Sequence, residues 1–182
     1  MLFRSAASTA AAKIRTLVVD MLNYGAAAQT YFGYNEKDLA TSKLTAAQKA
    51  LATGDVSCTD KRVKGENYYG SNLSLEDRII LNLYFKNCTE GMTAKVTYTD
   101  YCGRTVTSDA AVEPYSGSIC KVVVDEIVLA DAFCPVTVTV YNGEKLHGIA
   151  TDSVESYVAR AEGSDLYENI MKFAYAARAY LS

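Results

Sequence analysis

The chain has 182 residues, of which 49% are hydrophobic and 21% charged, and its formal net charge is -3 at pH 7. This composition is typical of a globular protein that is large enough to bury a core. The slight negative charge argues against nucleic acid or an anionic membrane as a partner, and no apolar run approaches the roughly 20 residues that a membrane-spanning helix needs. The first residues, MLFRSAASTAAAKIR, also lack the continuous apolar stretch of an export signal.

The first predicted element is a helix over residues 8–32. Apolar residues recur here at alternating steps of four and three, which places them on one stripe of a helix. The stripe consists of Leu17, Met21, Tyr24, Ala28 and Tyr31. Gly25 costs a helix about 1 kcal/mol relative to alanine, so we expect another element to approach the helix closely at this point.

A connector and a short second helix follow. Residues 33–42 show no regular period and are predicted to be a connector. Thr45 and Gln48 have the spacing of a capping box, and Gly54 is suited to end a helix. We therefore predict a short helix over residues 45–52.

After Gly54 the hydrophobic period changes to two and stays near two through the middle of the chain. Strands are predicted at residues 79–85, 92–99, 120–125 and 136–141, with a hairpin formed by the turn 100–103 and residues 104–108. In the first strand, Ile79, Leu81, Leu83 and Phe85 share one face. Short strands at this spacing predict an immunoglobulin-like or fibronectin-like β-sandwich.

The turn that begins at Asn142 decides where the only histidine of the chain, His147, points. A two-residue loop would pair Val138 with His147, whereas a three-residue loop with a bulge would pair Val138 with Leu146. An unpaired polar ring costs a few kcal/mol to bury. We therefore expect the bulged loop, with Leu146 buried and His147 exposed.

Helical character returns after the last strand. Asp152 or Ser153 can cap a short helix that runs to Arg160, and Ser164 can cap a closing helix after the interruption at Gly163. The apolar stripe of the closing helix consists of Leu166, Ile170, Phe173, Ala177 and Tyr180.

The closing helix repeats the first one. A shift of 149 positions matches residues 17–32 (LVVDMLNYGAAAQTYF) with residues 166–181 (LYENIMKFAYAARAYL). Such self-similarity indicates the end of one unit followed by a whole second unit of a tandem array. We expect residues 1–54 to end the preceding repeat, residues 55–150 to form the sandwich, and residues 151–182 to close the module. The N-terminal and C-terminal helices are expected to pack on the sandwich.

Three segments carry a further signal: NYGAAAQTYF in the first helix, LTAAQKALA after the connector, and SVESYVARAEGSDLYENIMKFAYAARAYL at the end. Together they resemble a module of large multimodular surface or secreted proteins of anaerobic Gram-positive bacteria. Those proteins also carry immunoglobulin-like repeats, sugar-active domains or wall anchors. The resemblance implies an extracellular or cell-surface location, with neighbouring modules of the same polypeptide as partners. It implies no catalytic residue.

The cysteines do not have the spacing of a metal site. They are Cys58, Cys88, Cys102, Cys120 and Cys134. They form no CxxC pair and have one histidine to assist them, so we predict no metal and no cofactor. The odd number leaves at least one thiol unpaired within the chain, and the sequence does not choose a disulfide among the five.

No catalytic signature accompanies these features. Asp125 and Glu126 are adjacent on a predicted strand, so they point to opposite faces and cannot flank one glycosidic bond. Neither of the Gly-rich phosphate-binding motifs GxxxxGK[ST] and GxGxxG occurs. We therefore do not expect an enzyme.

The 14 tyrosines are the most suggestive chemical feature, because a tyrosine ring offers a flat apolar face with a polar tip on which a sugar ring can stack. The candidate ligand-binding residues are Tyr68, Tyr69, Tyr98, Tyr101 and Tyr115. The leading hypothesis is a non-catalytic structural or adhesion module of an extracellular surface protein. The alternative is a carbohydrate-binding module that uses these tyrosines.

Overall fold

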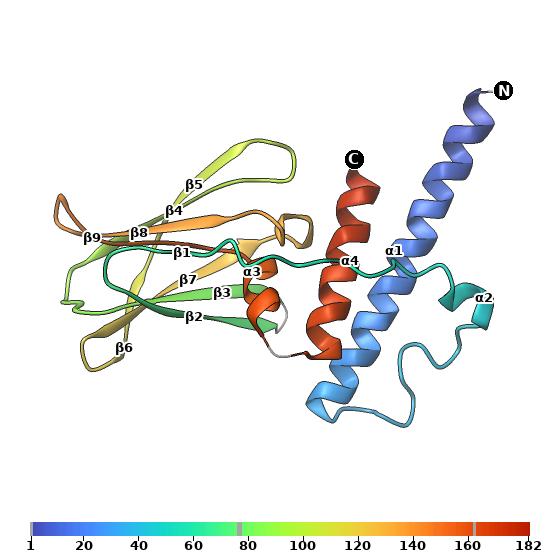
Figure 1. Ribbon diagram of the computed structural model, residues 1–182, viewed down its shortest axis with the longest axis horizontal. Helices are drawn as coiled ribbons and strands as arrows, with labels where there is room; N and C mark the ends of the chain where they lie inside the picture. Colours follow the sequence, from blue (N-terminus) through green and yellow to red (C-terminus); the bar gives the residue numbers. More distant parts are fainter. Residues whose placement is uncertain (1, 76–77, 162) are drawn as a thin grey trace. The chain divides into compact units, whose positions relative to one another are not determined.

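The structure of the protein is a computed structural model that describes residues 2–75, 78–161 and 163–182 (Figure 1). It consists of two compact units. Residues Met1–Ser57 and Ala161–Ser182 form a helical unit, and residues Cys58–Arg160 form a β-rich unit. In the sequence, the β-rich unit is therefore inserted between the two parts of the helical unit.

The helical unit is built on two antiparallel helices, α1 (Leu2–Phe32) and α4 (Asp165–Leu181), which lie side by side (Figure 1). The ring of Tyr24 stacks on the ring of Phe173, with centroids 6.2 Å apart and planes at 24°. These two residues are also matched by the shift of 149 positions in the sequence. The two similar segments therefore contact each other at one pair of equivalent positions.

The helix α4 begins and ends as predicted. The hydroxyl of Ser164 caps its first turn by accepting a hydrogen bond from the backbone N–H of Leu166. Because α4 has 17 residues and α1 has 31, α4 covers only part of α1. The half of α1 before about Thr16 extends past the end of α4, since the pair is centred on Tyr24 and Phe173.

The predicted stripe of α1 is wrong at two positions. Met21 and Tyr31 are 46% and 56% exposed, whereas Val19 and Ala26 are buried. Asp20 is buried as well, because its carboxylate accepts hydrogen bonds from the backbone N–H and the hydroxyl of Thr53 at 3.0 and 2.5 Å. The connector as well as α4 covers α1, so the buried face is displaced from the apolar stripe.

The connector folds back along α1. The side chain of Gln29 accepts a hydrogen bond from the backbone N–H of Ala40 and donates one to the carbonyl of Asp38. A Cβ atom at Gly25 would lie 3.4 Å from the Cβ of Ala40, so the close approach expected at Gly25 is made by the connector.

The short predicted helix is confirmed as α2 (Ala46–Lys49), although it ends earlier than expected. The side chain of Thr45 accepts from the N–H of Gln48, and the side chain of Gln48 accepts from the N–H of Thr45. This reciprocal pair is the predicted capping box.

The β-rich unit contains two antiparallel sheets. One has the order β1-β9-β8-β4-β5 and the other the order β2-β3-β7-β6 (Figure 1). The strands are β1 (Val63–Lys64), β2 (Tyr68–Leu75), β3 (Ile79–Phe85), β4 (Thr93–Thr99), β5 (Thr105–Ala110), β6 (Val112–Ser116), β7 (Ile119–Ile127), β8 (Val136–Asn142) and β9 (Lys145–Asp152). A 3-10 turn, η1 (Leu129–Asp131), and a helix, α3 (Val154–Arg160), complete the unit.

The core of this unit follows the predicted alternation. Leu81, Leu83 and Phe85 of β3 are fully buried, and the valines at alternate positions of β7 and β8 are buried too. Full burial of each such side chain contributes about 1.5 to 3 kcal/mol. The chain is thus a mixed α and β protein with two antiparallel sheets between helices in the sequence.

The hairpin between β8 and β9 differs from the predicted one. Its loop is Gly143 and Glu144, since Asn142 pairs with Lys145, and the bulge lies beside Val140 rather than in the loop. The whole of β9 is therefore displaced along β8 relative to the expected register. Val138 accordingly pairs with neither of the two residues considered for it.

This register reverses the expected burial. Val138 pairs with Ala150, Leu146 is 44% exposed, and His147 is half-buried. The prediction of a buried Leu146 and an exposed His147 is wrong. Nε2 of His147 lies 2.9 Å from the carbonyl oxygen of Lys86, and this hydrogen bond offsets the cost of partly burying the ring.

None of the helices in residues 2–75, 78–161 and 163–182 has both the length and the hydropathy needed to cross a membrane.

Candidate functional site

The five predicted tyrosines do not gather at one place. Tyr98 is only 8% exposed and belongs to the buried face of β4. Tyr101 lies in the turn after β4, where its backbone N–H donates to a carboxylate oxygen of Asp131 at 2.6 Å. The remaining three, Tyr68, Tyr69 and Tyr115, belong to the other sheet.

Tyr68 and Tyr69 are neighbours with different surroundings. The ring of Tyr68 meets Phe85 edge to face at 6.3 Å, and its hydroxyl donates to the hydroxyl of Ser71. Tyr69 is exposed, and the ammonium group of Lys86 lies 5.4 Å from its ring centroid. Tyr68 is therefore half-buried against Phe85, and Tyr69 is a surface ring with a cation over it.

Tyr115 lies beside a second tyrosine, Tyr84, which is not among the five candidates predicted from the sequence. The ring centroids of Tyr84 and Tyr115 are 4.7 Å apart, with the planes tilted by 58°. Tyr84 is on β3 and Tyr115 on β6, and β7 lies between these strands. The rings therefore meet above β7, on the face of the sheet opposite to the buried side chains of β3.

The strand register identifies the neighbours of this ring pair. Tyr84 is paired with Gly70 of β2 on one side and with Lys121 of β7 on the other. Glu113 of β6 pairs with Lys121, and their charged groups are 3.0 Å apart. Directly paired residues on adjacent strands share one face of a sheet, so all of these groups face the same way.

The next row of the same face carries two amides. Asn72 is paired with Asn82, and the amide of Asn82 donates to Asn72 at 2.8 Å. Asn72 is exposed. We call the group formed by Gly70, Asn72, Tyr84, Tyr115, Lys121 and Glu113 the tyrosine platform.

The environment of the platform alters the ionisation of Tyr84. Burial raises the pKa of the Tyr84 hydroxyl, and the neighbouring Tyr115 acts in the same direction, while Lys121 and a hydrogen bond with Asn72 act against it. The hydroxyl consequently stays protonated at neutral pH and is available as a donor.

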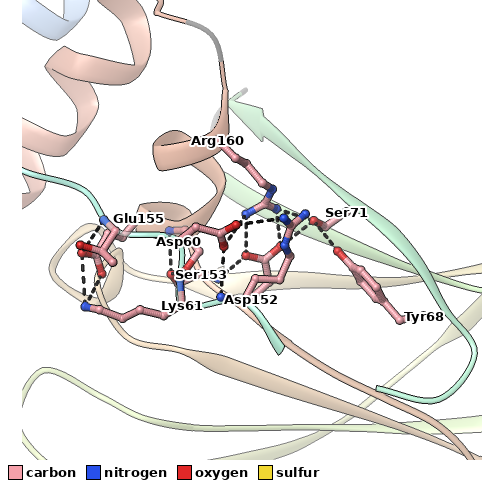
Figure 2. A network of polar contacts seen from close by, with 11 residues as sticks. Asp60, Lys61, Tyr68, Ser71, Asp152, Ser153, Glu155 and Arg160 are labelled. Carbon is pink, nitrogen blue, oxygen red and sulfur yellow. Dashed lines mark hydrogen bonds and ion pairs between the residues drawn. The ribbon is translucent and has the colours of Figure 1, made fainter. Parts of the chain in front are cut away.

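A second set of polar groups lies at the junction of β2, β9 and α3 (Figure 2). The carboxylate of Asp152 is fully buried and forms an ion pair with Arg160. The hydroxyl of Ser71 donates to the same carboxylate at 2.5 Å. We call Tyr68, Ser71, Asp152 and Arg160 the Asp152 network.

The hydroxyl of Ser71 resembles a nucleophile next to an acid, but its surroundings do not suit that role. It accepts hydrogen bonds from Tyr68 at 3.0 Å and from Arg160 at 2.6 Å, and it donates to Asp152. One donor and two acceptor positions are the full capacity of a hydroxyl. The arrangement orders the structure rather than activating Ser71.

The same junction contains a second ion pair, between Glu155 of α3 and Lys61 (Figure 2). The carboxylate of Glu155 also accepts a hydrogen bond from the backbone N–H of Thr59, and the hydroxyl of Ser156 accepts one from the N–H of Lys61. We call these four residues the Glu155 network. It ties the segment that begins the β-rich unit to the helix that ends it.

Two cysteines form a disulfide. Cys88, which follows β3, is bonded to Cys120 of β7. Cys58, Cys102 and Cys134 are not part of this disulfide. Burial raises the pKa of the Cys58 thiol, and the nearby Glu155 adds to this effect while Lys61 opposes it. The thiol is therefore protonated at neutral pH and a weak nucleophile.

Acidic groups order the turn after β4. The carboxylate of Asp100 accepts hydrogen bonds from the backbone N–H groups of Cys102 and Arg104 and from the side chain of Arg104. These bonds, led by the one from the backbone of Arg104, lower the pKa of Asp100. Asp100 is a turn-forming residue in this arrangement.

Within the part of the chain that the structure describes, no three His, Cys, Asp or Glu side chains are grouped so that they could hold a metal ion. The ring of His147 is directed to the carbonyl of Lys86.

One signal in the sequence could have identified Tyr84. The alternation of β3 buries Leu83 and Phe85, so Asn82 and Tyr84 must lie on the outer face. What the sequence does not contain is the lateral order of the strands, which brings Tyr115 beside Tyr84. The two networks at α3 join residues about 90 positions apart, and no local pattern predicts them.

Comparisons of the chain with protein-family models, with curated proteins and with solved structures found no match.

Proposed function

We propose that the chain is a non-catalytic structural module of an extracellular, multimodular bacterial surface protein. In this proposal its helix pair connects successive modules, and its β-rich unit is presented for adhesion. The observation that carries the proposal is the stacking of Tyr24 on Phe173, two residues that occupy the same position of a duplicated segment.

The duplicated helix explains why such a pair would form a joint. If α1 is the closing helix of a preceding module, α1 and α4 are two versions of one element. Two versions of one helix that pack antiparallel through equivalent residues form an approximately isologous contact, like the contact in a twofold dimer. The same contact can then recur wherever one module follows another.

The strand order supports an immunoglobulin-like sandwich. The order β2-β3-β7-β6 corresponds to strands A, B, E and D of that fold, and β9-β8-β4-β5 corresponds to G, F, C and C′. The disulfide departs from the antibody pattern, since Cys88 and Cys120 join the equivalents of B and E within one sheet. It therefore braces one sheet instead of connecting two.

The disulfide also supports an extracellular location, because disulfides persist in oxidising compartments and are rare in the cytosol. The Glu155 network supports the modular role. It connects the two ends of the β-rich unit to each other within that unit. A unit whose ends are tied together can be carried by different neighbours.

The joint can be tested by removing α1. A chain of residues 33–182 leaves α4 without its partner, and since α4 resembles α1, we expect the truncated protein to dimerise through two copies of α4. Light scattering after size-exclusion chromatography would report the mass. Phe173→Asp should return the truncated protein to a monomer, because it places a charge at the centre of the contact.

Tyr175→Asp is the matched control, since Tyr175 is on the same helix but 53% exposed. It should leave the dimer intact. A truncated protein that remains monomeric, with an unchanged melting temperature, would contradict the proposed joint. A dimer that Phe173→Asp does not dissociate would contradict it as well.

A further inference from the structure

The tyrosine platform exposes aromatic surface that the fold does not require. Tyr115 is 60% exposed, and its ring rests on Tyr84 rather than on the core. The residues on either side of Tyr115 in β6 are also exposed, so no core contact holds this part of the strand. The ring of Tyr115 is therefore positioned by its contact with Tyr84 at the surface and not by packing against the core.

The platform also has a gap. A Cβ atom at Gly70 would have no heavy atom within 4 Å. Gly70 is the cross-strand partner of Tyr84, so no side chain extends from β2 at the position directly beside Tyr84. The backbone of Gly70 does not have the positive φ that favours glycine. The backbone conformation therefore does not require glycine at this position. What glycine provides here is the space that a side chain would otherwise fill.

Hydrogen-bonding groups surround the gap. The exposed amide of Asn72 lies two residues from Gly70 on the same face, and the ion pair of Lys121 and Glu113 lies on the other side of Tyr84. The opposite charges of the pair compensate each other. A ligand of this surface would meet two ring faces, an amide and a charge pair with no net charge.

We propose that the tyrosine platform binds the pyranose rings of a neutral polysaccharide. One face of a pyranose presents C–H groups, which are attracted to the negative face of an aromatic ring. Its hydroxyls at the rim can exchange hydrogen bonds with Asn72, with the Tyr84 hydroxyl and with the charged pair. One sugar stacks on Tyr115 and its neighbour occupies the gap over Gly70.

Two members of the platform, Tyr84 and Lys121, are held in place before any ligand arrives. Tyr84 lies between the fully buried Leu83 and Phe85, and Lys121 follows the disulfide-bonded Cys120. Preorganised groups lose little conformational entropy on binding, so even a shallow surface can bind a ligand.

A proline-rich peptide would also stack on tyrosines. It offers few donors to Asn72 and Glu113, whereas a sugar offers a hydroxyl on most of its carbons.

Affinity gel electrophoresis of the full chain tests this inference. The gels contain xylan, laminarin, lichenan, galactomannan or pullulan, with a gel lacking polysaccharide as the reference. We expect retardation by at least one of the five. Tyr115→Ala should weaken that binding by roughly tenfold or more, as loss of a central aromatic anchor does. Gly70→Val should do the same by filling the gap without removing any group.

Tyr69→Ala is the matched control. Tyr69 is an exposed tyrosine of the same strand as Gly70, but its ring contacts the ammonium group of Lys86 and not Tyr84 or Tyr115. It should bind like the unaltered chain, and all variants should keep the wild-type melting temperature. Absence of retardation in all five gels overturns the inference. So does equal loss in Tyr69→Ala and Tyr115→Ala, or binding of a polyproline peptide by the platform in place of the sugars.

This inference goes beyond the proposed function, and the two can fail separately. The joint between modules is tested by the mass of the truncated chain, and the platform by retardation in gels. A platform without sugar binding would leave the helix joint unaffected.

Discussion

Arg160 and Asp152 form a buried ion pair in the β-rich unit. The carboxylate is fully buried, and the side chain of Arg160 is 17% exposed. Removing one partner of a buried pair leaves an uncompensated charge, whereas removing one partner of an exposed pair costs little. The same type of contact therefore has a different energetic weight at different places on this chain.

We expect Arg160→Met to lower the free energy of unfolding by about 3 to 5 kcal/mol, the usual cost of leaving a buried charge unpaired. Urea denaturation followed by circular dichroism measures it. Arg78→Met is the control, because Arg78 and Asp125 form a half-exposed pair and its loss should cost about 1 kcal/mol or less. Equal effects of the two substitutions would contradict this account of Asp152.

The sequence predicts the position of an individual residue correctly where burial alone decides which face of a strand it occupies. The alternation in residues 79–85 predicts the buried Leu81, Leu83 and Phe85 correctly, since a strand has only two faces. Polar residues are different. The burial of Asp20 depends on Thr53, and that of Asp152 on Arg160. Such pairings arise from the folded path of the chain, which a hydrophobic period does not encode.

At the scale of elements, the disulfide joins the end of β3 to the start of β7. The two strands are already paired side by side, so the bond closes a loop of the chain rather than creating a new contact between layers. The sequence left this pairing open among five cysteines, because cysteine spacing does not determine connectivity.

Loss of this bond should lower stability substantially. The two cysteines are 32 positions apart, and a crosslink that closes a loop of this size stabilises by about 3.5 kcal/mol in the chain-entropy account. Cys88→Ser/Cys120→Ser should lower the midpoint of urea unfolding accordingly. Cys102→Ser, at an exposed free thiol, should not. An unchanged midpoint for the double variant would show that the bond contributes no stability.

The elements that the sequence missed share a lack of alternation. The strand β2 carries Gly70, Ser71 and Asn72 in succession, and β6 contains Pro114. Polar runs and proline weaken a strand pattern. These two segments form strands because the apolar strand β3 and the strand β7 offer them free edges. The long periodic helices, in contrast, were predicted: the bounds of α4 and the end of α1 are as expected, although α1 begins at Leu2 instead of residue 8.

At the scale of the whole molecule, the chain has two units, and α3 belongs to the β-rich one. The sequence grouped α3 with the closing helix because both are helical. Its contacts with Lys61 and Ser71 place it instead with the strands. The packing of the N-terminal and C-terminal helices on the sandwich stays a prediction.

Residues 58–160 should fold without the helical unit. Both sheets and both polar networks lie within this range, so the isolated unit keeps its core and the ties between its ends. A two-dimensional NMR spectrum should show dispersed amide signals that overlay on those of the full chain. Residues 65–150 are the control, since they lack both networks and should lose dispersion. A collapsed spectrum for residues 58–160 would contradict the independence of the unit.

If the chain is one module of the proposed array, the pairing of Tyr24 with Phe173 bears on how such an array changes over generations. A joint made of two different surfaces must keep both of them compatible whenever a module is gained or lost. A joint made of two versions of one helix needs no such adjustment, because any closing helix meets a version of itself. Recombination can then lengthen, shorten or reorder the chain while each junction remains intact, and selection is left free to act on the surfaces that the strands present.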